Sequence, residues 1–492
     1  MKRTPLIFGG LVGVAALWSG AWYAGKTFYV EPRADEAVEQ LRSGAVFFSF
    51  DRRTVSGFPF GYDIAYEMVA MSDVSLLWRW TAPLIRLETG VADAGAMTVT
   101  ASESSVLVLE PQLMGAADGS PMVFDIVSEG LSATLSGNAD ESEALISAVG
   151  VTMTQKEGAS VISGGKAELS DVQAKVESWP EAGDYRADVN VGRLSINYRF
   201  SRDGVNETSS SSELTGIQIG IETRALSGGD LGEFLANNGE ASFKIEAEAY
   251  NGTASSTGGP SDPPVSIIHE SGEMVAEASI VEGRARYASV VSSIDTKVDV
   301  QAPGPLSKLA FVMDKLDMSV EMPLQQADEA QPYVMGLEVD DMKVDEAVWG
   351  TLDPLGKLDR SAMQFEVEIT GGARVLTDFL SDHLAQSPID LETFVIKELE
   401  LEALGAKMEA EGAFEIAGDA SRSDGEMEVS VEGGFALLDN LADAGLIPAA
   451  ALGAYQALIS QFSVRDGDDD KLTTKIESRR GQVSINGRVV SQ

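Results

Sequence analysis

The chain offers few side chains that are suited to nucleophilic or acid–base chemistry. It has two histidines, His269 in "SIIHESGE" and His383 in "ARVLTDFLSDHLAQSP", and it has no cysteine. A zinc site needs histidine or cysteine ligands at close spacing, and neither HExxH nor a cysteine pair occurs. The chain also lacks a GxSxG elbow, an SxxK pair, a P-loop and a GxGxxG turn after a strand. The sequence therefore predicts no enzyme, with no catalytic, cofactor-binding or metal-binding residue.

Carboxylates are abundant, but their spacing indicates no site. Among 77 acidic residues, pairs of the kind that glycosidases use can be found anywhere, so they carry no information. The run "RDGDDDK" resembles a calcium loop, yet Lys471 stands where the turn of an EF-hand needs glycine. We expect a solvated hairpin loop there. Asn206 and Asn251 begin glycosylation sequons, a pattern that arises often by chance.

The composition excludes one class of partner. The 492 residues include 77 Asp and Glu against 36 Lys and Arg, for a net charge of −41. This field repels nucleic acid, and no basic arm compensates for it. The acidic excess favours solubility over cation binding. Hydrophobic residues make up 44%, which is enough for a large folded core.

The N-terminus reads as a signal anchor. About twenty uncharged residues follow the basic N-terminal pair, which is long enough to cross a bilayer. Aromatic residues gather at the far end of this run, as in an interfacial belt. We therefore predict a transmembrane anchor over residues 1–30, with the body of the chain in the periplasm and a single pass through the inner membrane. The anchor residues are Lys2, Arg3, Trp18, Trp22 and Tyr23.

A cleaved signal peptide is the alternative reading of this segment. Ser19 and Ala21 are small residues at the spacing that a signal peptidase recognises. Both readings export the remaining chain. In the next segment, "EPRADEAVEQLRSG", Ala37, Val38 and Leu41 lie at helical spacing and Gly44 fits a C-cap, so a short juxtamembrane helix is expected.

Most of the remaining chain alternates between apolar and polar residues, which predicts half-buried strands. In "ADVNVGRLSINYRF" the apolar parity switches at Gly192-Arg193, which indicates a bulge or kink. Turn-rich breaks recur between the strands. The predicted fold is mainly β (α+β), with large antiparallel, curved sheets and a few helices behind one N-terminal transmembrane helix. Alternation is clearest in "AMTVTASESSVLVLE", "SFKIEAEAY", "SIDTKVDV", "MQFEVEIT", "AKMEAEGAFEI", "EMEVSVEG" and "LTTKIES".

The domain organisation is read from composition. Residues 251–264, "NGTASSTGGPSDPP", are small, polar and rich in Gly and Pro, which predicts a linker or surface loop. It separates two β-rich exported regions, 31–250 and 265–492, which are either separate domains or halves of one sheet. Helices are expected near 373–387 and 435–463, where apolar residues recur at helical spacing.

Two aromatic-rich segments could hold a ligand or only start the fold. In "RTVSGFPFGYDIAY" the glycines permit bends and Pro59 disfavours helix. We expect this segment to open the first strand, with Phe58 and Phe60 in the core. Trp78 and Trp80 share a strand face and are expected to pack in the core or at a sheet edge.

The order of these segments resembles a bacterial family known as domain of unknown function 2125. It runs from an anchor through a short helix, "GFPF" and "WRWTAPLIRLE" to "WGTLDPLGKLDRS" and "AGLIP". Gly61-Tyr62-Asp63 departs from the basic residue expected after the Gly-Phe-Pro. The family is uncharacterised, so the resemblance implies no activity. The family-marker residues are Gly57, Phe58, Pro59, Trp78, Trp80, Pro83, Trp349, Asp353 and Pro354.

More distantly, the plan is similar to the AsmA-like periplasmic envelope proteins, which are linked to lipid transport. The hypothesis is an inner-membrane-anchored periplasmic protein that binds or transfers lipid in the cell envelope. The alternative is a structural or protein-interaction component of the envelope without a lipid ligand, and a hydrolase with an inconspicuous site is a third. The membrane is the expected partner, through the N-terminal helix, whereas protein partners are not indicated.

Overall fold

The structure is a computed structural model of the chain. It describes residues 19, 23, 26–32, 34–35, 38–39, 46–58, 61–90, 96–110, 112, 121–137, 141–156, 162–179, 182–201, 207–224, 239–259, 262–302, 307–376, 389–416, 423–465, 470–479 and 481–491.

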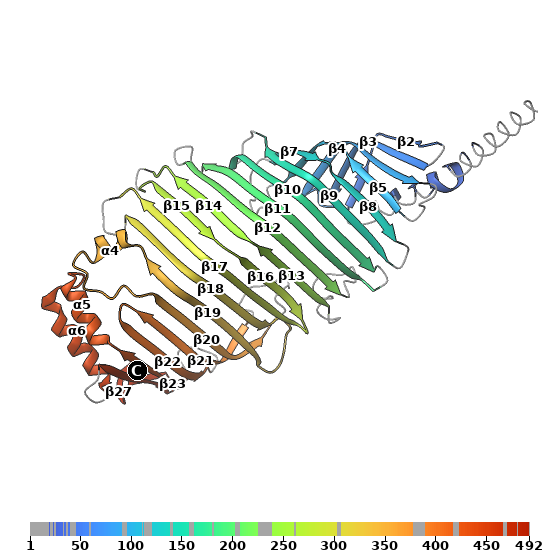
Figure 1. Ribbon diagram of the computed structural model, residues 1–492. Helices are drawn as coiled ribbons and strands as arrows, with labels where there is room; N and C mark the ends of the chain where they lie inside the picture. Colours follow the sequence, from blue (N-terminus) through green and yellow to red (C-terminus); the bar gives the residue numbers. More distant parts are fainter. Residues whose placement is uncertain are drawn as a thin grey trace, which may run out of the picture. The chain divides into compact units, whose positions relative to one another are not determined.

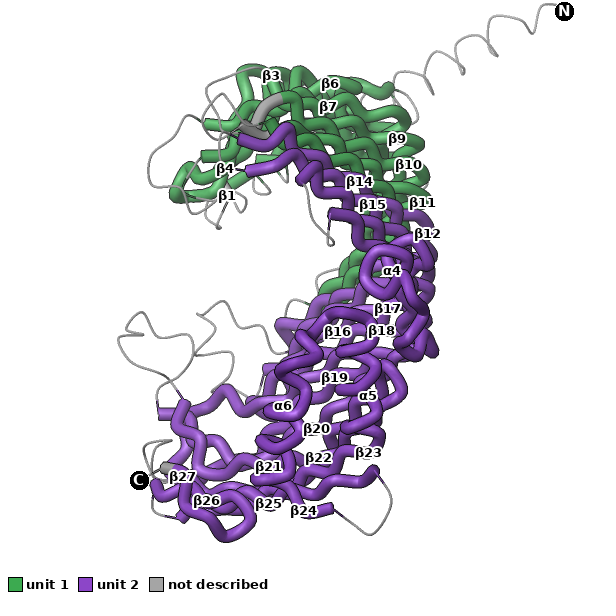
Figure 2. Tube along the Cα trace, turned by 90° about the vertical axis from the view of Figure 1, so that its left-hand side faces the viewer, with its two compact units in different colours: residues 1–181, 186–213 green, residues 182–185, 214–492 purple. Residues whose placement is uncertain are grey.

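The chain divides into two compact units, which Figure 2 distinguishes by colour. Unit 1 comprises residues 1–181 and 186–213, and unit 2 comprises residues 182–185 and 214–492. Both are built almost entirely from antiparallel strands (Figure 1). The predicted fold class, mainly β with a large antiparallel sheet and few helices, is therefore confirmed for the described residues.

Unit 1 is a meander of strands in which most partners are near neighbours in the sequence. β3 pairs with β1, β2 and β4, and β9 pairs with β7, β8 and β10. The strands are β1 (Val46–Ser49), β2 (Arg52–Ser56), β3 (Gly61–Asp73), β4 (Trp78–Gly90), β5 (Ala96–Ala101), β6 (Ser104–Leu109), β7 (Met122–Glu129), β8 (Ser132–Gly137), β9 (Ser142–Gln155), β10 (Ile162–Trp179) and β11 (Asp184–Ser201).

The core of unit 1 joins the segment that precedes β1 to the first strands. Val38 is helical and buried, as the sequence predicts, and it clusters with Phe48, Ile64, Tyr66 and other apolar residues. The rings of Phe48 and Tyr66 meet edge to face, with centroids 5.8 Å apart. Such aromatic pairs add to the free energy gained from buried area alone. This contact fixes the start of the sheet.

Unit 2 is also an antiparallel meander of strands. Strand β12 (Glu207–Arg224) begins in unit 1 and ends in unit 2. The others are β13 (Glu240–Ala247), β14 (Ala249–Ser256), β15 (Val265–Ser271), β16 (Met274–Val281), β17 (Arg284–Val300), β18 (Lys308–Pro323), β19 (Gln331–Val344), β20 (Met363–Val375), β21 (Ile389–Ala403), β22 (Ala406–Glu415), β23 (Asp424–Glu432), β24 (Val464–Arg465), β25 (Lys471–Arg479), β26 (Gln482–Ile485) and β27 (Arg488–Ser491).

Three α-helices occur among the described elements, all in unit 2. Helix α4 (Glu346–Leu352) follows β19, and α5 (Gly434–Asp443) and α6 (Ala449–Phe462) form a hairpin between β23 and β24. Figure 1 shows this hairpin beside the C-terminal strands. It lies where the sequence places helices near 435–463. Near 373–387, residues 373–375 extend β20, and residues 377–388, with His383, lie outside the described residues.

Left-handed residues interrupt the long strands. They include Met68 in β3, Asp171 in β10, Ser293 in β17 and Asp341 in β19, with φ between +50° and +53°. Beyond Val339 in β19 the register shifts, so that three steps along β19 match two along β20. Because β19 has one extra residue here, the apolar residues shift from one sequence parity to the other. The apolar residues before and after the shift therefore still point to the same face of the sheet. The switch predicted at Gly192 lies beside Asp171, whose side chain a Cβ at Gly192 would approach to 3.0 Å.

The predicted start of the first strand needs correction. Two strands, β1 and β2, precede Gly57, which has φ +102° and turns the chain from β2 into β3. A Cβ there would lie 2.8 Å from the Gly61 oxygen, so glycine is required. Phe58 is 49% exposed, so its predicted place in the core is wrong; the turn carries its side chain outward. Pro59 and Phe60 lie outside the described residues.

The first six residues of the segment predicted as a linker have a regular structure. Residues 251–256 belong to β14, which pairs with β15 in an antiparallel hairpin. Its small polar side chains are compatible with a strand because the neighbouring strands supply the backbone partners. Residues 257–264 form the connection, in which Gly259 N–H donates to the Asp262 oxygen over 2.8 Å.

The predicted anchor falls largely outside the described residues. Lys2, Arg3, Trp18 and Trp22 are not among them, whereas Tyr23 is helical and exposed. A short π-helix, η1 (Lys26–Val30), follows, and Lys26 Nζ donates to the Val55 oxygen over 3.1 Å. Within the described part of the chain, no helix combines the length and the apolar character needed to span a bilayer.

Candidate functional site: the apolar face of unit 2

Of the side chains first considered for chemistry, His269 and Asp470 lie in the described part of the chain, and both hydrogen-bond within the fold. His269 Nδ1 lies 2.8 Å from Thr296 Oγ1 within the sheet. Across the described ranges, no three His, Cys, Asp or Glu side chains are placed to hold a metal ion. Asp470, from the supposed calcium loop, instead accepts hydrogen bonds from the backbone N–H groups of Phe435 and Ala436 at the start of α5. It therefore caps a helix.

A continuous apolar surface is the most extended feature of unit 2, and we call it the apolar face. Antiparallel register places residues from successive strands opposite one another, on the same side of the sheet. Three cross-strand rows from β12 or β13 to β25 carry mostly apolar side chains. They are Ile221, Phe243, Ala278, Tyr287, Val320, Met335, Ile369, Ile396, Gly412, Met427 and Ile476; Ile219, Ile245, Ala276, Ser289, Met318, Leu337, Val367, Leu399, Ala410, Val429 and Thr474; and Ala247, Met274, Val291, Leu316, Val339, Phe365, Leu401, Met408, Val431 and Leu472.

This face is incompletely covered. Met335 is 46% exposed and Met318 is 39% exposed, and Ile221, Phe243 and Tyr287 are also exposed. In the three rows only Ala247, Ala410 and Leu472 are fully buried. Exposed apolar side chains that stand singly are ordinary, but a contiguous patch of them marks an interaction surface. The apolar face is therefore the candidate functional site.

The opposite face of the same strands is charged. Its lysines pair with carboxylates on their own and on neighbouring strands: Lys315 Nζ lies 2.7 Å from Glu338, and Lys407 Nζ lies 3.0 Å from both Glu400 and Glu409. These pairs are solvated, so each contributes little to stability. Alternation thus gives the sheet one apolar and one solvated side.

Carboxylates outnumber lysines in the middle of the charged face. The register aligns Glu338, Glu366, Glu400 and Glu409 across four strands. Partial burial, with repulsion from neighbouring glutamates including Glu398, raises the pKa of Glu366. A hollow of about 650 Å³ over β21–β23 and β25 is lined mainly by such charged side chains. This polar, acidic hollow does not suit an apolar ligand.

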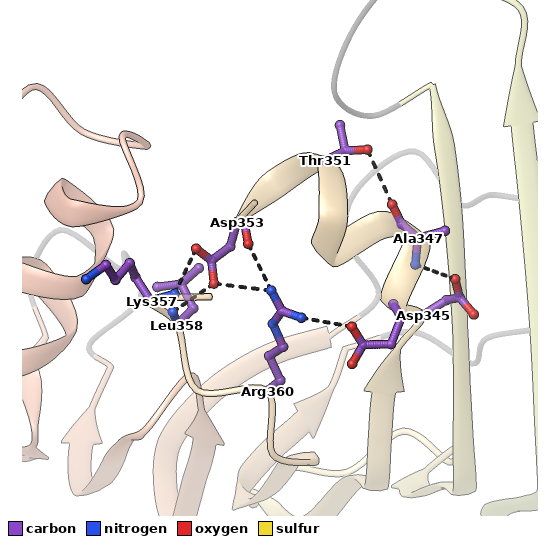
Figure 3. A network of polar contacts seen from close by, with 8 residues as sticks. Asp345, Ala347, Thr351, Asp353, Lys357, Leu358 and Arg360 are labelled. Atoms are coloured by element: carbon purple, nitrogen blue, oxygen red, sulfur yellow. Dashed lines mark hydrogen bonds and ion pairs between the residues drawn. The ribbon is translucent and has the colours of Figure 1, made fainter. Parts of the chain in front are cut away.

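The segment "WGTLDPLGKLDRS" builds a compact cap on unit 2 (Figure 3). Asp345 begins α4 by accepting from Ala347 N over 2.7 Å. The Asp353 carboxylate at its end is fully buried and accepts from the backbone N–H groups of Lys357 and Leu358, both over 2.9 Å. Arg360 closes the loop by donating to the Asp353 carbonyl oxygen over 2.8 Å.

Trp349 is the apolar centre of this cap. It is 6% exposed, its neighbour Val348 is buried, and the Arg360 guanidinium lies 5.7 Å from the centre of its ring. The cap thus combines a buried aromatic ring, a buried carboxylate and one arginine that contacts both. Both marker residues, Trp349 and Asp353, are thus buried and held by contacts within this segment. Pro354, which follows them, is exposed in the loop.

Asp353→Asn should destabilise the protein at neutral pH, with a smaller effect in acid. Burial opposes ionisation, but the N–H groups of Lys357 and Leu358 and the Arg360 charge outweigh it and hold the pKa of Asp353 below its ordinary value of 3.8. A lowered pKa stabilises the fold above pH 3.8, and this contribution is lost as the pH falls through the lowered pKa. Asparagine leaves one backbone N–H without an acceptor, at a cost of about 1–3 kcal/mol.

Urea unfolding at pH 7 and at pH 3 checks this expectation. The difference in midpoint between the wild type and the Asn variant should be larger at pH 7. Asp359→Asn, at an exposed position in the same loop, is the matched control and should change little. An Asp353 variant with the same deficit at both pH values would contradict the role of the charge.

The remaining marker residues lie in unit 1 and have structural surroundings. Trp80 packs against the core, and its Nε1 donates to Ser105 Oγ over 3.0 Å. Trp78 is on the same strand face, and its backbone N–H donates to the Asp73 carboxylate. Pro83 stands at the position where the pairing of β3 with β4 skips Met68, so its missing N–H leaves the pairing intact.

Comparison with known proteins assigns a family but no activity. A family model described as "Uncharacterized protein conserved in bacteria (DUF2125)" matches residues 22–238 and 263–489. No curated protein and no solved structure matches the chain.

Proposed function

The chain belongs to the DUF2125 family of uncharacterised bacterial proteins, and from the apolar face of unit 2 we propose that it binds the acyl chains of lipids and transfers them in the cell envelope. The single observation that carries the proposal is the continuity of the apolar rows across the sheet, with exposed side chains on β12, β13 and β17–β19. The proposal assigns no catalysed reaction. It also keeps the location that the N-terminal sequence predicts, an anchor in the inner membrane with the body in the periplasm.

The dimensions of the face suit a lipid chain. The row from Ile221 to Ile476 crosses eleven strands. At a strand spacing of about 4.8 Å it extends for about 48 Å. The acyl chains of one leaflet span only about 15 Å, half of a bilayer core of about 30 Å. The row is therefore long enough for an acyl chain to occupy several positions along it, as transfer requires.

The apolar face is separated from the charged face, which answers the main objection to lipid binding, the acidic charge of the protein. An acidic protein repels anionic headgroups, and this chain has a net charge of −41. The carboxylate rows of unit 2 lie on the charged face, with Glu338, Glu366 and Glu400 on the side opposite Met335 and Ile369. An acyl chain on the apolar face is therefore separated from them by the sheet.

Lipid analysis of the purified protein tests the proposal. The full chain is purified, washed extensively and extracted, and its lipid is quantified by mass spectrometry beside a single-span membrane protein treated identically. We expect more acyl lipid per chain than the control carries. Lipid at the control level, together with specific protein adducts after crosslinking in cells, would overturn lipid binding in favour of a protein-interaction component of the envelope.

A further inference from the structure

A polar cluster lies on strands β14, β15 and β17, beside the apolar face and on the same side of the sheet. It consists of Tyr250, His269 and Thr296, and we call it the polar shelf. The register places His269 opposite Thr296, and Thr296 opposite Phe311. The next positions along the strands pair Ile267 with Val298. The shelf therefore borders apolar side chains on its own side of the sheet.

The three side chains of the shelf are held in one arrangement. His269 Nδ1 lies 2.8 Å from Thr296 Oγ1, and the rings of His269 and Tyr250 are 5.5 Å apart. The Tyr250 hydroxyl lies over Gly252, because a Cβ at Gly252 would come within 2.3 Å of it. Gly252 is also the register partner of His269. The absence of a side chain at Gly252 is what lets the tyrosine lie against the sheet beside the imidazole.

Polar groups of the shelf lack partners. Within the described ranges, neither the Tyr250 hydroxyl nor His269 Nε2 has a hydrogen-bond partner, and the hydroxyl of Ser271, which is paired with Tyr250, is buried without one. Tyr250, His269 and Thr296 are only partly buried, so water or a ligand can reach them. Covering such groups with pure hydrocarbon would be unfavourable, because they would lose water and gain no hydrogen bond.

We infer that the polar shelf hydrogen-bonds an acceptor oxygen of the lipid that the apolar face holds, either a fatty-acid carboxylate or a phosphate group. The inference rests on the proposed function and specifies where the polar end of the ligand lies. With the Thr296 hydroxyl donating to Nδ1, Nε2 carries a hydrogen and becomes a donor. The Tyr250 hydroxyl is the second donor. Two hydrogen-bond donors on rings whose centroids are 5.5 Å apart fit an anion better than an uncharged hydrocarbon end.

Binding to full-length protein that has been stripped of endogenous lipid tests the inference. The probes are palmitate, dipalmitoyl phosphatidic acid and hexadecane, which has no polar end. The variant carries Tyr250→Phe and His269→Leu, and the control variant carries Thr253→Val, on the same strand as Tyr250 but on the opposite face. For the double variant we expect about a tenfold or greater loss of affinity for the oxygen-bearing probe, with hexadecane unchanged.

The outcomes separate the shelf from the lipid-binding face. Loss confined to palmitate identifies a carboxylate, and loss confined to phosphatidic acid identifies a phosphate. Equal loss for hexadecane would mean that the shelf only packs, and unchanged binding of all probes would mean that it makes no contact; either result overturns the inference while lipid binding stands. If the wild type binds none of the probes, the proposed function fails as well. Matching thermal unfolding of the two variants verifies that the fold is intact.

Discussion

Replacing Met318 and Met335 by glutamate is expected to remove most of the lipid that co-purifies with the protein. The two methionines lie on neighbouring strands and in adjacent rows of the apolar face, where they are 39% and 46% exposed. A carboxylate beneath an acyl chain loses its water and finds no cation to pair with, so the charged form opposes lipid binding. Both changes together should lower the amount of lipid per chain at least about tenfold, equivalent to 1.4 kcal/mol or more.

The control for this variant lies on the other side of the same strand. Val312→Glu places the same charge in β18 at a side chain that is 44% exposed, between Asp295 and Lys343 on the charged face. Its lipid content should equal that of the wild type. If the lipid content fell equally in both variants, the added charge would be acting on the whole protein. If it fell in neither variant, the apolar face would not be the surface that binds lipid.

Trp349→Ala should give the largest loss of stability among the variants discussed. Truncating a buried tryptophan costs about 3–5 kcal/mol, because apolar burial is lost and a cavity remains. The Arg360 guanidinium would also lose the ring that it contacts at 5.7 Å. We expect a clear fall in the guanidinium chloride midpoint of the transition that reports on unit 2.

Leu355→Ala is the matched control for the tryptophan variant. It removes a large apolar side chain from the same segment, but one that is 66% exposed. Its effect should stay within about 0.5 kcal/mol, as for most surface substitutions. If Trp349→Ala were as mild as Leu355→Ala, the cap around Asp353 would not depend on the buried ring.

The strands were predictable because each carries its own two-residue period. "MQFEVEIT" and "EMEVSVEG" indicate half-buried strands without knowledge of any partner. The first lies within β20, and β23 covers the second except for its final Gly433. The apolar face could not be predicted from single segments of the sequence. Its rows depend on which residue of one strand stands opposite which residue of the next, as Met335 stands opposite Ile369. Register is a property of pairs of strands, and no single segment carries it.

The interruptions within strands explain other differences. The switch of apolar parity near Gly192 could be predicted because a glycine within a strand indicates a bulge or kink. Met68 and Ser293 adopt left-handed backbone although their residue types rarely do so, so their identity gives no signal. Asp171 and Asp341 adopt it too, and aspartate does so more often than most residues. The switch of parity itself is visible in β17, where Tyr287 and Val291 precede Ser293 and Ile294 and Val298 follow it.

The cap around Trp349 and the turn at Gly57 show that the sequence can single out family-marker residues without predicting their surroundings. The sequence singled out Trp349 and Asp353, but Asp345 and Arg360, which hold them, gave no signal of their own. Their roles arise from the way that α4 and its loop fold back on each other. Phe58 was expected in the core because it is aromatic, yet the positive φ of Gly57 directs the turn outward.

Photocrosslinking in cells tests most directly whether the apolar face holds lipid. A photoreactive phenylalanine analogue replaces Met335 in the full chain, and in a second strain it replaces Val312, which has similar exposure on the charged face. After irradiation, mass spectrometry of the purified protein should find acyl-lipid adducts at position 335 and none at position 312. Lipid adducts at neither position, or equally at both, would contradict the account.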